Sequence, residues 1–248
     1  MTKTTNRDGS RFYTVPNLDG DPINLPSVTT ILRAVAKPAL MYWAANAVAD
    51  YAVKNHDLIG NLLETNDTDG AIRLLKGSPW SQRDKAANVG TSIHDIIESL
   101  ILTDEADISP SQQPYVDAWV EFSKSLPEGR WDAAEMVVYN LDHRYAGTLD
   151  ALYRDINGHI GAFDWKVRKG KLKDKVSAYE TERLQVSAYM NATHILLPDG
   201  SSRPFPLVRG GSIVMLCDDG FAFERVHADD WPAFVHVCGL FGWMEGLK

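Results

Sequence analysis

The sequence predicts a mixed fold of helices and strands, of the α+β or α/β class, because the spacing of its apolar residues changes along the chain. Within residues 27–125 apolar side chains recur at three- and four-residue intervals, as helices require. From residue 134 they alternate or form short runs bounded by turn residues, which is typical of strands. The chain has 248 residues, 44% of them hydrophobic, which is enough for one large core. We therefore expect a single domain, 1–248.

The N-terminal half is expected to be helical after a short arm. Residues 11–26 alternate weakly around Asp19-Gly20 and predict a hairpin. Ser27 is a candidate cap for the next helix, and Pro38 opens another that runs to residue 55. Further helices are expected at 61–76, 82–103 and 112–125, with Gly77-Ser78-Pro79 between the first two and a polar acidic stretch, 103–111, between the last two.

The C-terminal half is expected to carry the sheet. Three successive strands are predicted at 134–140, 145–155 and 159–167, and a helix at 177–192 follows them. The chain then reads ILL, SIVMLC and FAFERV, which indicate strands, the last two joined around Asp218-Asp219-Gly220. A final helix is expected at 229–246.

Two acids lie on the two arms of the hairpin formed by residues 145–167. Asp164 and Lys166 share one face of their strand, while Phe163, Trp165 and Val167 point the other way into a core. The face of Asp150 depends on the turn. A two-residue loop puts it on the opposite face from Asp164, whereas a three-residue loop closed by a left-handed Gly158 puts the two acids directly opposite each other.

Directly opposed residues have Cβ atoms about 4.5–5.5 Å apart. Two carboxylates at that distance repel each other unless a cation lies between them, so the three-residue loop predicts Mg²⁺ or Mn²⁺ on oxygen ligands. A sheet-edge hairpin with solvent-facing charges is the alternative, and the hairpin alone does not choose between them.

Composition excludes several classes of protein. The formal net charge of −8 excludes a polycation that coats nucleic acid, so a DNA contact would have to be local. Cys217 and Cys238 are far apart and have no metal-spaced neighbours, which excludes a zinc finger and a four-cysteine iron–sulfur cluster. Without a signal peptide or a run of eighteen apolar residues, we expect a cytoplasmic chain with no membrane partner.

Two more short patterns accompany the hairpin. His94 and Glu98 lie one turn apart on the helix GTSIHDIIE, and Gln185 and Tyr189 lie one turn apart on the helix that follows the hairpin. Alone, a single His is more often a packed or surface residue than a ligand, and a Gln–Tyr pair is uninformative.

Together and in this order the four patterns resemble the RecB-like branch of the PD-(D/E)XK nuclease superfamily. Its series GTxxH, GxxD, DxK and QxxxY stands here as Gly90 to His94, Gly147 to Asp150, Asp164 to Lys166, and Gln185 to Tyr189. The resemblance covers residues 85–195 well. It extends loosely to 25–32, which looks like the N-terminal segment of the mitochondrial genome-maintenance exonuclease and of related phage exonucleases. Some relatives carry an iron–sulfur cluster, but this chain lacks the cysteines, so no cluster is expected.

The resemblance implies a restriction-endonuclease-like core, in which helices flank a central mixed sheet of four or five strands. Residues 1–80 would form an arm and helices that make a wall over the site. Residues 81–195 would form the catalytic core, and residues 196–248 the C-terminal strands and helix.

The resemblance also implies roles for individual residues. Mg²⁺ or Mn²⁺ would be held by His94, Asp150, Asp164 and the backbone carbonyl of Trp165. Lys166 would orient water or stabilise developing charge, while Gln185 and Tyr189 would place the phosphate or the nucleophile. Glu135 is a candidate for a further acid, and Glu98 for a hydrogen bond that supports His94. The residues themselves add candidate DNA contacts: a basic run follows the catalytic strand and is either a solvated loop or a track for the DNA backbone, and it contains Arg168, Lys169, Lys171, Lys173 and Lys175. Thr91 either binds a phosphate or caps a turn, and the sequence does not choose.

The function that follows is a metal-dependent DNA exonuclease acting in recombination, repair or replication, in the host cytoplasm if the chain is phage-encoded. A flap or junction endonuclease, a catalytically inactive DNA-binding subunit and a non-nuclease metal hydrolase are the alternatives. The sequence does not decide the polarity of digestion, the preference for single or double strands, or the choice between DNA and RNA. It also leaves open whether a recombination protein or a second copy of the chain is a partner.

Overall fold

The computed structural model describes residues 2–6, 8–17, 20–168, 172 and 176–246, and these residues form two compact units. One unit comprises residues 1–35 and 93–248, and the other comprises residues 36–92. The single domain expected from the sequence, with its division at residue 80, stays a prediction. The N-terminal arm belongs with the sheet because Tyr13, Val15 and Leu25 are buried in one cluster with Val137 and Tyr139.

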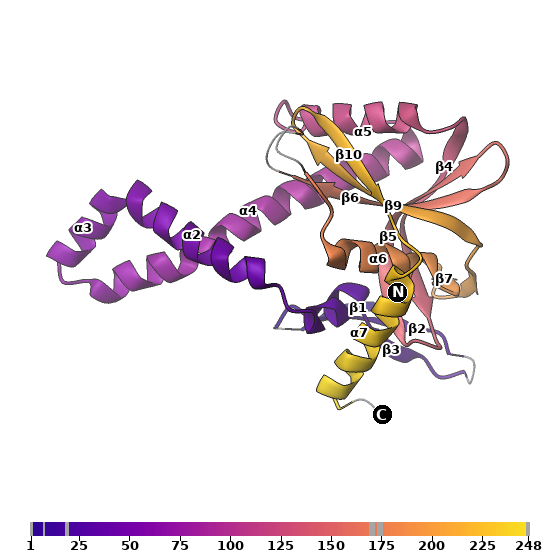
Figure 1. The fold of residues 1–248 in the computed structure, drawn as a ribbon, viewed down its shortest axis with the longest axis horizontal. Helices are drawn as coiled ribbons and strands as arrows, with labels where there is room; N and C mark the ends of the chain where they lie inside the picture. The colour runs from indigo at the N-terminus through magenta and orange to yellow at the C-terminus, as the bar shows by residue number, and fades with distance from the viewer. Residues whose placement is uncertain (1, 7, 18–19, 169–171, 173–175, 247–248) are drawn as a thin grey trace. The chain divides into compact units, whose positions relative to one another are not determined.

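The larger unit is built on a seven-stranded mixed sheet, with more strands than the four or five expected (Figure 1). The parallel pairing of β6 with β9 makes it mixed, because every other neighbouring pair is antiparallel. In spatial order the strands are β10 (Gly220–Arg225), β9 (Val208–Cys217), β6 (Ile160–Val167), β5 (Tyr145–Asp155), β4 (Gly129–Asn140), β7 (His194–Leu196) and β8 (Ser202–Pro204).

Helices pack on both faces of this sheet. On one face α5 (Gln113–Ser125) buries Phe122 against Phe163 and Trp165. Three isoleucines of α4 (Thr68–Thr103) join the same cluster: Ile93, Ile96 and Ile97. On the other face α6 (Glu180–Met190) and α7 (Asp230–Met244) pack against β5 and the start of β6. Figure 1 shows α5 and α6 on opposite sides of the sheet.

The N-terminal arm forms a small antiparallel sheet of β1 (Thr2–Thr5), β2 (Arg11–Val15) and β3 (Ile23–Pro26). Asp19 of the expected turn lies outside the described residues. The predicted cap is confirmed, because the Ser27 side chain accepts a hydrogen bond from the Thr30 N–H at the start of α1 (Val28–Ile31). A 3₁₀ turn, η1 (Leu32–Ala34), follows α1.

The smaller unit is helical, as expected, but its helix boundaries differ. It contains α2 (Pro38–Lys54), α3 (His56–Glu64) and the first part of α4, which continues through Pro79 without a break. The separation predicted at Gly77-Ser78-Pro79 is therefore wrong. Pro79 has no N–H for the Leu75 carbonyl, and the Ser78 hydroxyl donates to that carbonyl instead, over 2.9 Å.

No helix among the described residues combines the length and the apolar character needed to cross a membrane.

Candidate metal centre

Of the two hairpin loops that the sequence left open, the structure has the three-residue loop. The Asp155 N–H donates to the His159 carbonyl over 3.0 Å, and Gly158 has a φ of 78°, in the left-handed region. The ladder of β5 and β6 ends at Ala151 opposite Phe163, so Asp150 and Asp164 are the next facing positions. There the strands separate, and Asp150 Oδ2 accepts the Trp165 N–H over 2.7 Å.

A third acid lies across the next strand. β4 pairs Ala134 with Ala151 and Met136 with Leu149, which leaves Glu135 facing Asp150. Glu135 has a φ of 48°, a left-handed conformation that is uncommon outside glycine and asparagine, and it interrupts the ladder at this position. Three acids, on three adjacent strands, therefore lie in one row across the sheet.

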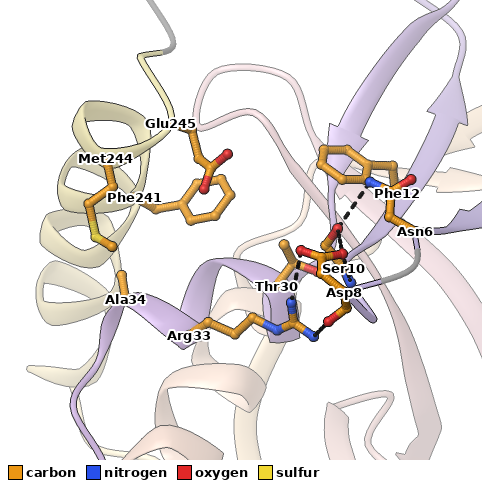
Figure 2. Close-up of a pocket in the computed structure, with 10 residues that line it drawn as sticks. All are labelled: Asn6, Asp8, Ser10, Phe12, Thr30, Arg33, Ala34, Phe241, Met244 and Glu245. Carbon is orange, nitrogen blue, oxygen red and sulfur yellow. Dashed lines mark hydrogen bonds and ion pairs between the residues drawn. The ribbon is translucent and has the colours of Figure 1, made fainter.

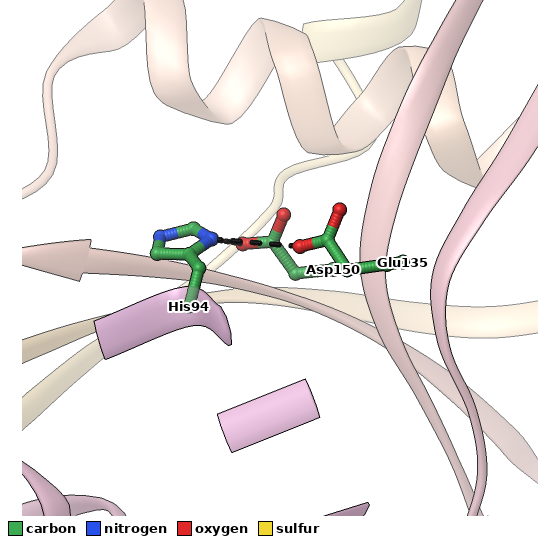
Figure 3. A group of neighbouring side chains, drawn as sticks. All are labelled: His94, Glu135 and Asp150. Atoms are coloured by element: carbon green, nitrogen blue, oxygen red, sulfur yellow. Dashed lines mark ion pairs between the residues drawn. The ribbon is translucent and has the colours of Figure 1, made fainter. Parts of the chain in front are cut away.

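His94 of α4 meets this row (Figure 3). Its Nδ1 lies 3.4 Å from Asp150 Oδ2 and 3.7 Å from Glu135 Oε1, and its Nε2 lies 3.0 Å from the Trp165 carbonyl oxygen. One ligand atom from each of His94, Glu135 and Asp150 lies within 4.8 Å of the others, a spacing that could hold a metal ion. The structure thus brings together His94, Asp150 and the Trp165 carbonyl, and places Glu135 with them.

Asp164 faces a second set of partners. Its Oδ2 lies 2.5 Å from Lys166 Nζ, and its Oδ1 accepts a hydrogen bond from Gln185 Nε2 over 3.0 Å. Gln185 Nε2 also donates to the Tyr189 hydroxyl over 3.1 Å. One chain of polar contacts therefore links Lys166, Asp164, Gln185 and Tyr189.

Gly147 of the GxxD pattern lies directly against Tyr189 of the QxxxY pattern. A Cβ placed on Gly147 would lie 2.5 Å from Tyr189 Cε1 and 3.1 Å from the Tyr189 hydroxyl oxygen. Only glycine leaves room for the buried Tyr189 ring beside β5, so Gly147 is a packing requirement of the site.

Burial and charge set the protonation of the group. Burial opposes ionisation of Asp164 and, with the neighbouring Asp150 charge, raises the Asp164 pKa to about 6 despite the favourable Lys166 charge. Burial also disfavours the charged form of His94, but the carboxylates of Asp150 and Glu135 outweigh it and raise the His94 pKa to about 9. At neutral pH His94 is therefore an imidazolium between two acids.

The donor set fits a hard divalent cation. Asp150 and Glu135 offer carboxylate oxygens, His94 offers an imidazole nitrogen, and the buried Asp164 Oδ2 has no hydrogen-bond donor among the described residues beyond its ion pair with Lys166. Oxygen ligands with one imidazole suit Mg²⁺ and, better, Mn²⁺. A cation would also replace the imidazolium proton as the positive charge between the acids.

The remaining predicted residues do not join this group in the way expected. His94 is held by Trp165, Asp150 and Glu135, and no hydrogen bond to Glu98 is found among the described residues. Burial nevertheless raises the Glu98 pKa, and the nearby negative charge of Glu135 raises it further. Thr91 is exposed and belongs to the smaller unit, whose placement relative to the sheet is not described.

Of the basic side chains in the predicted run, only Arg168 lies among the described residues. Arg168 donates from Nη2 to both carboxylate oxygens of Glu182, and its guanidinium lies 5.0 Å from the Tyr179 ring centroid. Its charge is thereby neutralised within the protein. Four members of the run lie outside the described residues: Lys169, Lys171, Lys173 and Lys175.

Sequence reasoning missed one neighbour of the centre. The Tyr13 hydroxyl lies 2.9 Å from Thr148 Oγ1, next to Asp150, and the Tyr13 ring is buried. No motif marks this residue, because its position depends on the docking of β2 against the central sheet.

A pocket of about 410 Å³ lies between the N-terminal arm and α7 (Figure 2). The Arg33 guanidinium turns to Asp8, with its Nη1 3.6 Å from the carboxylate and its Nη2 donating to the Asp8 carbonyl. The charges of Arg33 and Asp8 in this pocket are therefore already paired with each other.

Comparison with known proteins leaves the family open. No protein-family profile and no curated protein matches the chain. Eighteen chains of solved structures match, among them the crystal structure of SSO0001, at 16% identity and a TM-score of 0.32. That match covers 55% of this chain and 62% of the SSO0001 chain, so it spans less than two thirds of the length of SSO0001. A likeness this low carries no argument about function.

Proposed function

We propose that this protein is a metal-dependent deoxyribonuclease of the PD-(D/E)XK type, in the RecB-like branch, and that it hydrolyses DNA from ends. One observation carries the proposal: Asp150 faces Asp164 and Glu135 across neighbouring strands, with His94 and Lys166 against them. Two acids of the row, Asp150 and Asp164, are buried and therefore costly to ionise, and a site that binds a divalent cation and a phosphate accounts for the arrangement.

The residues divide into two groups by what they contact. Glu135, Asp150 and His94, with Asp164 beside them, would hold Mg²⁺ or Mn²⁺. The bound ion would lower the pKa of a water molecule and offset charge on the phosphate. Lys166 supplies an ammonium group that can orient a nucleophilic water or stabilise the charge that develops on phosphate oxygens. Gln185 fixes Asp164 through one N–H, and this keeps the carboxylate pointed at the centre.

A cleavage assay tests the proposal. End-labelled single- and double-stranded DNA, with each end blocked in turn, is incubated with Mg²⁺, with Mn²⁺ or with EDTA. We expect metal-dependent release of short products that stops when the attacked end is blocked. Cutting of circular single strands would instead assign a flap or junction type of endonuclease, and absence of cleavage of any DNA with either metal would refute the nuclease.

Matched variants connect the activity to the centre. Asp150→Asn is nearly isosteric and removes one carboxylate charge, so we expect loss of cleavage. Asp142→Asn makes the same change at an exposed site in the turn between β4 and β5, and should cleave like the unmodified protein. Equal activity of the two variants would contradict the assigned role of Asp150.

A further inference from the structure

A second hollow lies on the α5 face of the sheet, at the other end of β6 from the acids. Its volume is about 730 Å³. Gly161, at its floor, is three residues before Asp164, which corresponds to about 10 Å along a strand. Phe163 lines the hollow, whereas its neighbour Asp164 points to the opposite face. The hollow is therefore separate from the candidate metal centre.

Small residues create the hollow. Gly161 pairs with Gly210 on β9, and Phe163 pairs with Ser212, so β9 presents nothing larger than a serine on this part of the face. A Cβ on Gly210 would meet no atom within 4 Å. The last turn of α5, which ends at Ser125, lines one side of the hollow through Phe122 and Ser125. Glycine in a strand often marks a place where a ligand comes close to the backbone.

The walls are aromatic. Phe122 contacts Phe163, Phe221 and Phe223, with ring centroids 5.6, 5.3 and 6.0 Å away. Phe223 is 48% exposed although it lies within this cluster. A half-exposed ring that packs against the buried Phe122 ring is a surface on which a flat ring can stack.

Two arginines lie at the rim. Between Ile160 and Gly161 the register of β6 with β9 shifts, so that Arg209 is the extra residue of a bulge, and bulges re-aim side chains. Arg225 faces Ser212 across β10 and β9 and also lines the hollow. Neither arginine has an ion-pair partner in the part of the chain that the structure describes. Asp155, the acid in the lining, is already bonded to His159.

We infer that this hollow binds a nucleotide of single-stranded nucleic acid, with a base stacked on Phe223 and backbone phosphates on Arg209 and Arg225. An aromatic wall beside guanidinium groups that have no ion pair within the described residues matches the two parts of a nucleotide, the flat base and the anionic phosphate. In a duplex the bases are stacked on one another, so a single strand fits better. The choice of a nucleic acid over another aromatic anion rests on the proposed nuclease function.

Binding of fluorescein-labelled oligothymidylate, followed by anisotropy in EDTA, tests the inference without cleavage. Phe223→Ala should weaken binding about tenfold, as expected for one lost stacking contact. Arg209→Gln with Arg225→Gln should weaken binding further and reduce the slope of log K against log salt by about 1.4, or about 0.7 for each phosphate contact. Arg203→Gln, an exposed arginine on β8 at the other edge of the sheet, is the matched control and should bind normally.

The outcomes separate this site from the nuclease itself. If the unmodified protein cleaves DNA but these variants bind oligothymidylate as it does, the hollow is not a nucleotide site and the nuclease stands. If the variants lose binding while no DNA is cleaved with any metal, the nucleotide site stands and the nuclease fails. Binding of duplex DNA as tight as that of the single strand, or no binding by the unmodified protein, overturns the inference. Circular dichroism of each variant checks that it is folded.

Discussion

Replacing Gly147 of β5 by alanine should destabilise the protein, because the new methyl group would collide with Tyr189 of α6. The new Cβ would lie 2.5 Å from Tyr189 Cε1, whereas ordinary contacts begin at 3.4 Å, so the ring must move by about 0.9 Å. Overpacking of this kind costs about 1–3 kcal/mol. Movement of the ring also strains the Gln185–Tyr189 hydrogen bond, which adds about 1 kcal/mol. We therefore expect a loss of about 2–4 kcal/mol in the free energy of unfolding.

Urea unfolding in EDTA measures this loss, and a double-mutant cycle assigns its cause. Tyr189→Ala removes the ring that the new methyl group would strike, so Gly147→Ala should cost at least about 1 kcal/mol less in that background. Gly90→Ala serves as a control: a Cβ there meets nothing within 4 Å, and alanine favours a helix by about 0.5–1 kcal/mol. Equal costs of Gly147→Ala with and without the Tyr189 ring would refute the packing argument.

Three other predictions follow from the same centre. Lys166→Met leaves the fully buried Asp164 without its cationic partner. Urea unfolding in EDTA should show a loss of about 3–5 kcal/mol in the free energy of unfolding. An unchanged value would show that the ion pair does not stabilise the protein. The His94 pKa is raised from 6.5 to about 9 in the metal-free protein. The charged imidazole therefore stabilises the fold fully below pH 6.5, and this contribution is lost as the pH rises through 9. Between pH 6.5 and 9 the unmodified protein should lose more free energy of unfolding than His94→Gln. Mn²⁺ should raise the melting temperature, and Glu135→Gln should reduce that rise whereas Asp142→Asn should not; equal rises would remove Glu135 from the site.

The sequence was sufficient where local chemistry determines the structure. Ser27 has the side chain of an N-cap, so the cap was predictable. The sequence left two hairpin registers open, and the left-handed Gly158 of the structure selects the three-residue loop. From that register, the facing positions of Asp150 and Asp164 follow.

Other features depend on contacts between distant segments. Glu135 faces Asp150 only through the pairing of β4 with β5 and a left-handed backbone that no neighbouring residue signals. The continuity of α4 depends on the Ser78 hydroxyl replacing a lost backbone donor, whereas Gly77-Ser78-Pro79 reads as a break. The local sequence does not signal that the Arg168 guanidinium donates to the carboxylate of Glu182, fourteen positions later.

Crystals grown with Mn²⁺ and examined by anomalous scattering test the central claim most directly. We predict one strong peak bound by Asp150 and Glu135, with His94 or Asp164 completing the ligands. Density that shows these acids still paired only with His94 and Lys166, with no manganese beside them at saturating concentration, would contradict the metal centre on which the proposed chemistry rests.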